Sequence, residues 1–385
     1  MPMLDVAIVG AGPVGLYLGA LLLQEGLSVR ILEQRAAAGT HSRAIGIHPP
    51  GLDALARAGV APQLLAEGLR ITSGAGYSAG KRVTELRFDR LGNAYPFILS
   101  LPQARTEAIL AARVHALDPH AVQRAVTVTA AHDAGDSLTL STAHHRGSVA
   151  ARLVVGADGA RSTLRTQLGI ATRGRDYPDN FLMGDFVDTG SHGPAAVLYL
   201  EPGGIVESFP LPGGLRRWVA HTPRFHSDAG AEFLTALIAE RTAVAVDPRG
   251  NSMLSAFKVR SRHATRMVAG RAALIGDAAH EISPIGGQGM TLGWLDAAAL
   301  APIMAAALRG EDTGARLRQF QRSRQRAAAQ ASAQAWLNTA LGRRQPASLL
   351  ALRHRLAGAA LDHPRIHDAV ARRFSMAPWQ GPGIP

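Results

Sequence analysis

The stretch Val6-Ala7-Ile8-Val9-Gly10-Ala11-Gly12-Pro13-Val14-Gly15 decides the fold of this chain. An apolar run leads directly into a glycine turn, and an apolar segment of helical length follows. A strand, a glycine turn and a helix in this order are the context in which G-x-G-x-x-G binds a dinucleotide, with the phosphates at the helix N-terminus. In such a turn Gly10 permits the tight bend, Gly12 lets the backbone approach a pyrophosphate, and Gly15 lets helix and strand pack closely. The stretch therefore predicts a Rossmann-type cofactor domain.

The next predicted strand ends on an acidic residue. Leu27-Ser28-Val29-Arg30-Ile31-Leu32 has the apolar character of a strand, and Glu33 follows it. A carboxylate about 20 residues beyond the glycines can accept hydrogen bonds from a ribose 2′-OH and would repel a 2′-phosphate. The site therefore suits FAD or NAD(H) rather than NADP(H). A glycine turn without a ligand is the alternative, and the strand–turn–helix context together with Glu33 argues against it.

Composition limits the classes of protein that the chain can be. Its 385 residues, 47% of them hydrophobic, are enough for about two domains with a large core. The absence of cysteine excludes disulfides, thiolate catalysis and cysteine-ligated metals, and the fifteen histidines without repeated close spacing indicate no metal site. The net charge of +12 comes almost entirely from arginines without a long basic block. We interpret it as charge spread over solvated faces and expect no nucleic-acid partner.

The chain carries no clear targeting signal. No basic segment precedes the first apolar run, and no apolar run reaches the roughly 20 residues that span a membrane. We therefore expect no signal peptide, no membrane span and a cytoplasmic location.

Helical and β-rich segments alternate along the chain. Hairpin-like sequence between Ile71 and Leu99 and again between Phe181 and Val259 interrupts helical segments, and an alanine-rich helical region runs from Leu292 to at least Arg343. This order predicts an α/β and α+β protein, in which a mainly antiparallel β-sheet domain is inserted into the cofactor domain and helices lie at the C-terminus. The expected domains are 1–72, 98–175 and 266–345 for the cofactor, 73–97 and 176–265 for the substrate, and 346–385 as a C-terminal helical segment and tail.

Two further strand-to-turn junctions carry an acidic residue. They are Gly156-Ala157-Asp158-Gly159-Ala160-Arg161-Ser162 and Gly276-Asp277-Ala278-Ala279-His280, and the second leads into the glycine-rich loop after Pro284. An aspartate at the carboxyl end of a strand can bind a hydroxyl of a ligand such as the ribityl chain of a flavin. The helix after the loop would point its N-terminal N–H groups at the N1–C2=O2 edge of the flavin, where negative charge accumulates on reduction.

These motifs, in this order, resemble those of the class A FAD-dependent monooxygenases, the para-hydroxybenzoate hydroxylase and polyketide aromatic hydroxylase group. The resemblance covers roughly Asp5 to Arg326. It is carried by the glycine stretch, the two acidic turns, Glu33-Gln34-Arg35, Tyr95-Pro96, Leu101-Pro102-Gln103, Glu107, Leu110, Pro284 and Gly286-Gly287-Gln288-Gly289.

The resemblance implies which residues bind FAD. Glu33 would bind the adenosine ribose, Arg43 would lie near the pyrophosphate, Gln103 would reach the ribityl or pyrophosphate region, Asp277 would hold the ribityl chain, and Pro284 would line the pocket at the flavin face. Met290-Thr291 stands where the family often has Leu-Asn, so only its backbone is expected to meet the flavin. The full expected cofactor set is Gly10, Gly12, Pro13, Val14, Gly15, Glu33, Gln34, Arg35, Arg43, Gln103, Asp158, Asp277, Pro284, Gly287, Gly289, Met290 and Thr291.

The resemblance also implies an activity. NADH or NADPH would reduce bound FAD, O2 would form a flavin C4a-hydroperoxide, and one oxygen atom would be inserted into an aromatic or polycyclic small molecule. Baeyer–Villiger oxidation, a reduction and a flavoprotein without turnover remain alternatives. The protein would be a monomer or a homodimer.

The substrate is expected between the flavin and the inserted sheet. Candidate lining residues, which at strand spacing are more often core than pocket, are Phe181, Phe186, Tyr199, Phe209 and Trp218. A general base would be useful for a phenol. His48, His221 and Tyr77 are candidates of which none is singled out, and His280 is interpreted as structural because it belongs to the Asp277 turn.

Overall fold

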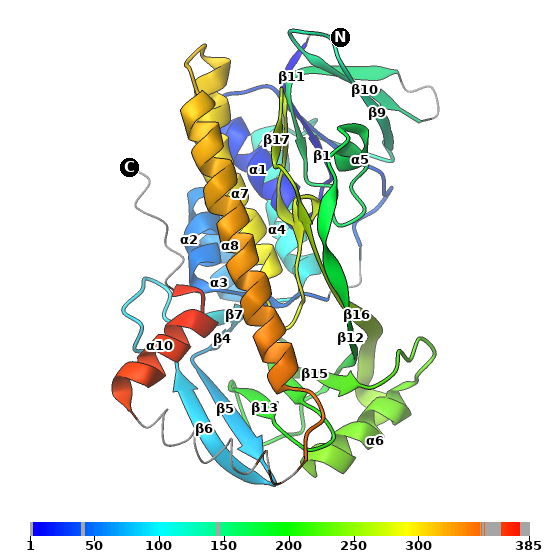
Figure 1. Cartoon of the computed structure of the whole chain (residues 1–385), viewed down its shortest axis with the longest axis vertical. Coiled ribbons are helices and arrows are strands. Elements are labelled where there is room, and N and C mark those ends of the chain that lie inside the picture. The colour runs from blue at the N-terminus through cyan, green and yellow to red at the C-terminus, as the bar shows by residue number, and fades with distance from the viewer. Residues whose placement is uncertain are drawn as a thin grey trace.

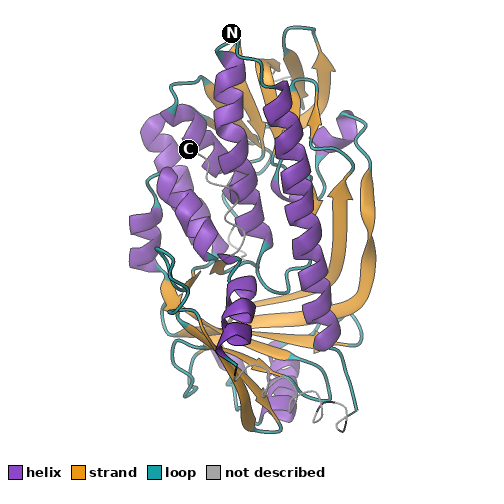
Figure 2. Ribbon diagram, turned by 60° about the vertical axis from the view of Figure 1, so that its left-hand side comes forward, coloured by secondary structure: helices purple, strands orange, loops and turns teal. Residues whose placement is uncertain are grey.

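The structure is a computed structural model that describes residues 3–39, 43–143, 147–346, 348, 350 and 363–377. It has two parts, each built on its own eight-stranded sheet. Figure 1 shows the N-terminal part above and the second sheet below, and Figure 2 shows helices packed along one side of both. The expected α/β and α+β organisation is confirmed.

The first sheet contains the parallel strands of the cofactor domain. Its central strands are apolar and buried, and Val6, Ala7 and Ile8 are 0% exposed, as expected of parallel strands that are covered on both faces. The strand order is β17 (Val268–Ala269), β18 (Ala272–Leu274), β11 (Ser148–Gly156), β1 (Leu4–Val9), β2 (Val29–Glu33) and β8 (Val122–Arg124), with β9 (Val128–Asp133) and β10 (Leu138–Thr142) attached to β11. The helices α1 (Pro13–Gln24), α4 (Gln103–Leu117) and α7 (Gly289–Leu308) pack beside it.

The second sheet is the expected inserted, mainly antiparallel sheet. Its order is β19 (His280–Glu281), β16 (Asn251–Ala264), β12 (Thr172–Val187), β15 (Leu215–Thr222), β14 (Val206–Leu211), β13 (Ala196–Tyr199), β5 (Ser73–Ser78) and β6 (Lys81–Arg87), and only the pair β13–β5 is parallel. Helix α6 (Ala231–Thr242) packs on one face through Leu234 and Ile238. The other face packs against Ile285 of the glycine-rich loop. We call these the outer face and the inner face.

Two long strands join the parts. β12 and β16 stay paired from Thr172–Ala264 to Phe186–Asn251, and they run along one side of the molecule from the lower sheet to the upper part (Figure 1). The expected domain boundary between residues 175 and 176 falls inside β12, so the division of the chain stays a prediction. A small third sheet of β3 (Gly46–Ile47), β7 (Ile98–Ser100) and β4 (Leu69–Ile71) lies between the two parts.

The expected C-terminal helical region contains two long helices. α7 ends at Leu308, Gly310 adopts a φ of +88°, and α8 begins at Gly314 and reaches Leu341. α7 is long and apolar enough to cross a membrane, but 72% of its most apolar window is buried inside the protein, as in a core helix. The remaining helices are α2 (Pro49–Arg57), α3 (Ala61–Glu67), α5 (Thr163–Gln167), α10 (Pro364–Phe374) and the short 3-10 helices Pro248–Gly250 and Gly276–Ala278.

The C-terminal segment predicted for residues 346–385 is described only in part. It contains α10, whereas residues 347, 349, 351–362 and 378–385, with most of the expected tail, lie outside the described residues. Ala371 in α10 packs against Phe88 beside β6.

Candidate functional site

The acidic candidates meet at one edge of the first sheet. β1 is parallel to β2 and β11, and β11 is parallel to β18. The carboxyl ends of these strands therefore lie side by side, and they lead into the Gly10 turn, Glu33, the Asp158 turn and the Asp277 turn. Ligands of open α/β sheets bind at this edge.

The three glycines of the first turn differ in what surrounds them. A Cβ on Gly10 would lie 2.5 Å from the carbonyl oxygen of Ala157, and one on Gly15 would lie 2.0 Å from that of Gly10. The backbone of Gly10 also has a φ of +103°, so both positions require glycine for the fold itself. A Cβ on Gly12 would meet nothing within 4 Å. Gly12 therefore borders open space at the N-terminus of α1, as the approach of a pyrophosphate requires.

Glu33 ties the second strand to the glycine turn. Its side chain is 4% exposed. Oε2 accepts the backbone N–H of Ala11 at 2.9 Å, and Oε1 accepts the N–H and the Nε of Arg35 at 2.9 and 3.0 Å. Burial raises the pKa of the carboxyl, but the hydrogen bonds from Arg35 and Ala11 outweigh it and the pKa is lowered. The ionised carboxylate keeps acceptor capacity for a ribose hydroxyl.

The Asp277 turn is anchored from the helices behind it. Asp296 of α7 is 0% exposed. Its Oδ2 accepts the N–H of Gly276 at 3.0 Å and lies 2.5 Å from Nε2 of His280, and its Oδ1 accepts Nε of Arg324 at 2.6 Å. Burial raises the pKa of Asp296, but His280 and Arg324 lower it further than burial raises it. His280 therefore holds the turn in place, in agreement with its structural interpretation.

Asp277 itself faces open space within the protein. Its side chain is exposed, yet the protein packed around it raises the pKa of its carboxyl, and nearby His280 only partly offsets this effect. A carboxyl that is accessible and has protein around it can meet a ligand bound at this edge of the sheet. This placement suits the hydrogen bond to a ribityl hydroxyl that was expected of Asp277.

Only one of the two carboxylate oxygens of Asp158 accepts a hydrogen bond from a described residue. Oδ2 accepts the N–H of Leu164 at the start of α5 at 3.1 Å, whereas Oδ1 is buried without a partner among the described residues. Buried polar atoms are normally hydrogen-bonded, so a free acceptor at this edge is suited to a ligand donor.

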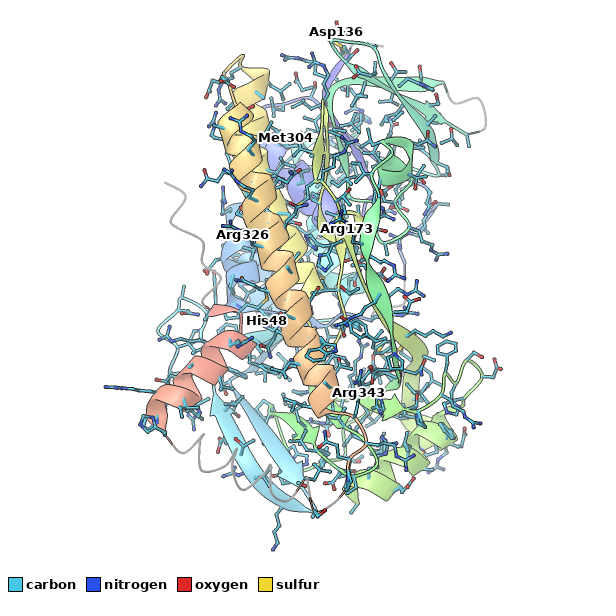
Figure 3. All side chains as sticks on the ribbon, in the orientation of Figure 1. His48, Asp136, Arg173, Met304, Arg326 and Arg343 are labelled. Atoms are coloured by element: carbon cyan, nitrogen blue, oxygen red, sulfur yellow. The ribbon has the colours of Figure 1, made fainter. Side chains whose placement is uncertain are left out.

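The glycine-rich loop leads into α7 and is held by His48. Gly286 and Gly287 adopt φ of +97° and +67°. Nε2 of His48 lies 3.1 Å from the carbonyl oxygen of Gly286, and Figure 3 labels His48 where the upper part meets the lower sheet. Burial lowers the pKa of His48 to about 4. The imidazole is therefore neutral at pH 7 and supports the loop.

The start of α7 presents backbone rather than side chains. α7 begins at Gly289. The side chain of Thr291 is 0% exposed, and a Cβ on Gly51 of α2 would lie 3.0 Å from its Oγ1. Pro284 is exposed beside the loop. The side chain of Thr291 thus points toward α2, and only its backbone is available to a ligand.

The loop after Glu33 is fixed by the second sheet. Arg217 is 2% exposed and forms two bonds with Asp185, at 2.6 and 2.8 Å. Its third nitrogen donates to the carbonyl oxygen of Arg43. The backbone N–H of Gln103 donates to the carbonyl oxygen of Ala44 at 3.0 Å. The Arg43 segment therefore lies between the two parts.

The expected lining residues divide between the two faces of the second sheet. Phe181 and Phe209 belong to the inner-face cluster with Ile285. The other three, which are Phe186, Tyr199 and Trp218, pack with Leu234 and Ile238 of α6 on the outer face. They are therefore core residues, which was the more frequent case at strand spacing, and they do not line a pocket on the inner face.

The remaining base candidates are engaged elsewhere. Nε2 of His221 lies 3.3 Å from Oδ1 of Asp179, and Arg343 at the end of α8 binds the same carboxylate at 2.9 and 2.8 Å (Figure 3 labels Arg343). Burial lowers the pKa of His221 more than Asp179 raises it. Tyr77 packs beside the outer-face cluster.

Sequence reasoning missed Glu207. It is 7% exposed, and no hydrogen bond or ion pair to another described residue satisfies its carboxyl. Burial raises the pKa of this carboxyl to about 7. The signal was a charged residue in the apolar strand Val206–Leu211.

The residues at the edge fit FAD. Gly12 leaves room for a pyrophosphate, Glu33 and Asp277 offer acceptors, and Asp158 has a buried oxygen without a partner. Within the described residues no group of three or more acidic, histidine or cysteine side chains could hold a metal ion.

The family model for the FAD binding domain matches residues 3–335, so the chain belongs to this family and its cofactor is FAD. It is 34% identical over 319 residues to the 6-methylpretetramide 4-monooxygenase of Streptomyces rimosus, a match that covers 80% of this chain but 56% of that protein. The chain thus spans little more than half the length of this relative.

Two solved structures share the fold. One is the p-nitrophenol 4-monooxygenase of Pseudomonas putida DLL-E4, with a TM-score of 0.87, 24% identity and 97% of each chain covered. The other is the Diels-Alderase of the biosynthetic pathway of pyrroindomycins, with a TM-score of 0.81, 26% identity, and 96% of this chain and 80% of that chain covered.

Proposed function

We propose that the protein is an FAD- and NAD(P)H-dependent monooxygenase that inserts one oxygen atom from O2 into an aromatic or polycyclic small molecule. The observation that carries the proposal is the edge of the first sheet, where Gly12 borders open space and Asp277 is accessible although protein surrounds it. The inner face of the second sheet packs on the glycine-rich loop beside this edge. The 6-methylpretetramide 4-monooxygenase supports the reaction class.

Each residue group has a task in this proposal. FAD, when bound, supplies hydride acceptance from NAD(P)H and activation of O2. The N-terminus of α1 at Gly12 binds the pyrophosphate, and Glu33 and Asp277 accept hydroxyls of the ribose and the ribityl chain. The backbone N–H groups at Gly289 and Met290 stabilise negative charge at the flavin pyrimidine edge.

The substrate lies between the loop and the inner face in this proposal. Phe209, which is only partly buried, provides aromatic surface there, and Phe181, which is 1% exposed, packs in the cluster beneath it. Ile285, which is 4% exposed, excludes water on the loop side. Exclusion of water suits oxygen transfer because it prevents hydrolytic side reactions of the activated oxygen.

The test is an absorbance spectrum of the purified protein, followed by anaerobic NAD(P)H and then air. An oxidised-flavin spectrum that NAD(P)H bleaches and air restores is expected, with faster bleaching when an aromatic substrate is present. A protein that binds FAD but is never reduced would favour a reaction without electron transfer, the option that similarity to a Diels-Alderase keeps open. A protein that takes up no FAD would refute the proposal.

The oligomeric state and the cellular location also remain proposals. We propose a monomer or a homodimer in the cytoplasm. Light scattering of the purified chain measures its molecular mass, for comparison with the 40.4 kDa of one chain, and cell fractionation tests the location.

A further inference from the structure

Glu207 lies on the inner face, near the start of β14. In the antiparallel pairs it stands directly opposite Val219 of β15 and Leu198 of β13. Directly opposite residues project from the same face of a sheet. Val219 and Leu198 both belong to the cluster that contains Ile285 of the glycine-rich loop. The carboxyl of Glu207 therefore lies on the side of the sheet that faces the proposed flavin site.

The surroundings of Glu207 are apolar. The residues opposite Glu207 on β13 and β15, Leu198 and Val219, are aliphatic. The loop between Pro284 and Gly287, which packs on this face, carries no titratable side chain. Several titratable groups share this face or border it. Asp185 and Arg217 bind each other, and Asp179 binds Arg343 and lies beside His221. Tyr177 packs against the same cluster, and the carbonyl oxygen of Arg43 accepts a hydrogen bond from Arg217.

Arg217 and Arg343 are thus engaged with other carboxylates. No described residue donates to Glu207, and its carboxyl oxygens are not sealed completely from solvent. A carboxyl that is more than nine-tenths buried without a donor is unfavourable for folding. Such a group on a face that borders a proposed active site is best explained by a donor that arrives with the ligand.

We propose that Glu207 binds a hydroxyl of the substrate and accepts its proton during the proposed reaction. The inference rests on the proposed function. The O–H bond of an aromatic hydroxyl breaks, its proton moves to a carboxylate oxygen of Glu207, and the electron pair of that bond stays on the substrate oxygen. The ring becomes richer in electrons, which favours transfer of an electrophilic oxygen atom to it.

The ionisation of Glu207 suits this task. Burial raises its pKa to about 7, so near neutral pH the carboxylate and the acid are both populated. A general base is most effective when its pKa lies near the working pH.

The experiment compares phenols with their methyl ethers in the full chain after FAD is added. Para-nitrophenol, a naphthol and a hydroxyanthraquinone, each beside its methyl ether, are titrated by isothermal calorimetry into the wild type, Glu207→Gln and the control Glu25→Gln. Gln keeps the size of the side chain but accepts no proton. Glu25 is exposed in the first part of the chain, so the control removes the same charge at a distant site.

At least one phenol is expected to bind the wild type about tenfold or more tightly than its ether, since hydrogen bonds to charged groups have this strength. For a weakly acidic phenol the preference should rise as the pH increases through about 7, because the carboxylate is the accepting form. Glu207→Gln should lose both the preference and its pH dependence, while Glu25→Gln should keep them.

Two results would overturn the assignment. One is that Glu207→Gln keeps the preference and its pH dependence, and the other is that no phenol of the set binds the wild type more tightly than its ether. Flavin content and bleaching by NAD(P)H are measured separately without any phenol. Normal bleaching together with either result refutes the role of Glu207 alone, whereas absent bleaching refutes the proposed function.

Discussion

Replacing Glu207 by Gln should stabilise the ligand-free protein at neutral and alkaline pH. The pKa of this carboxyl is raised from 4.5 to about 7. The native state therefore holds a proton that the unfolded chain has already lost, and stability is lost as the pH rises from about 4.5 through 7. A rise of the pKa from 4.5 to about 7 lowers the free energy of unfolding by about 3 kcal/mol at high pH, and about 2 to 3 kcal/mol of this loss occurs between pH 5 and 8.

The assay is denaturant unfolding of wild type, Glu207→Gln and the control Glu25→Gln at several pH values from about 5 to 8. The difference between Glu207→Gln and wild type isolates this carboxyl, because the other titrating groups are shared. We expect this difference to grow with pH by about 2 to 3 kcal/mol in favour of the variant. A difference that is the same at both ends of the range would refute the reasoning, as would an equal trend in Glu25→Gln.

Three further predictions concern the cofactor edge. Gly12→Ala should unfold like the wild type to within about 1 kcal/mol but bind FAD at least about tenfold more weakly in a fluorescence titration, and equal FAD affinity would contradict the open site. Gly15→Ala should unfold at a markedly lower denaturant concentration, because its Cβ would lie 2.0 Å from a carbonyl oxygen. Asp296→Asn should lose about 3–5 kcal/mol in denaturant unfolding because it leaves buried positive charge on Arg324 uncompensated, and a loss below about 1 kcal/mol would count against the anchor. Burial lowers the pKa of His48 to about 4. The free energy of unfolding should therefore fall as the pH drops from about 6.5 toward 4, because the unfolded chain gains the proton first. His48→Gln should remove this pH dependence, and an unchanged dependence in unfolding experiments would exclude His48 as its source.

Much of the cofactor edge followed from local sequence. Gly10, Glu33 and Asp277 each stand directly after an apolar run, and a strand followed at once by a turn places its next residue at the carboxyl edge of a parallel sheet. The structure brings all three to one edge. Their contacts with FAD stay predictions that the variants above test.

The C-terminal helices were harder to divide. Both α7 and α8 are rich in alanine, which favours helix everywhere. The break between them depends on Gly310, whose φ of +88° ends the first helix. Glycine can also occur inside a helix, so the single residue did not indicate the break.

The faces of the second sheet depended on tertiary structure. Alternation along a strand shows which residues share a face, but not which face meets the cofactor domain. Phe209 lies on the inner face and Trp218 on the outer face only because α6 packs on one side and the Ile285 loop on the other. The sequence therefore favoured core for aromatic residues at strand spacing but did not show which of them lie on the inner face.

The amino-acid sequence by itself determined the parallel cofactor sheet, its glycine turn and the acidic residues at its edge, because these depend on patterns within a few neighbouring residues. Only the tertiary structure decided the roles of His48 and Glu207. Each is an ordinary titratable residue in the sequence, and its pKa changes because elements distant along the chain bury it. Burial is a property of the packed molecule, so no local pattern could reveal that one supports the glycine-rich loop and the other lies on the inner face of the second sheet.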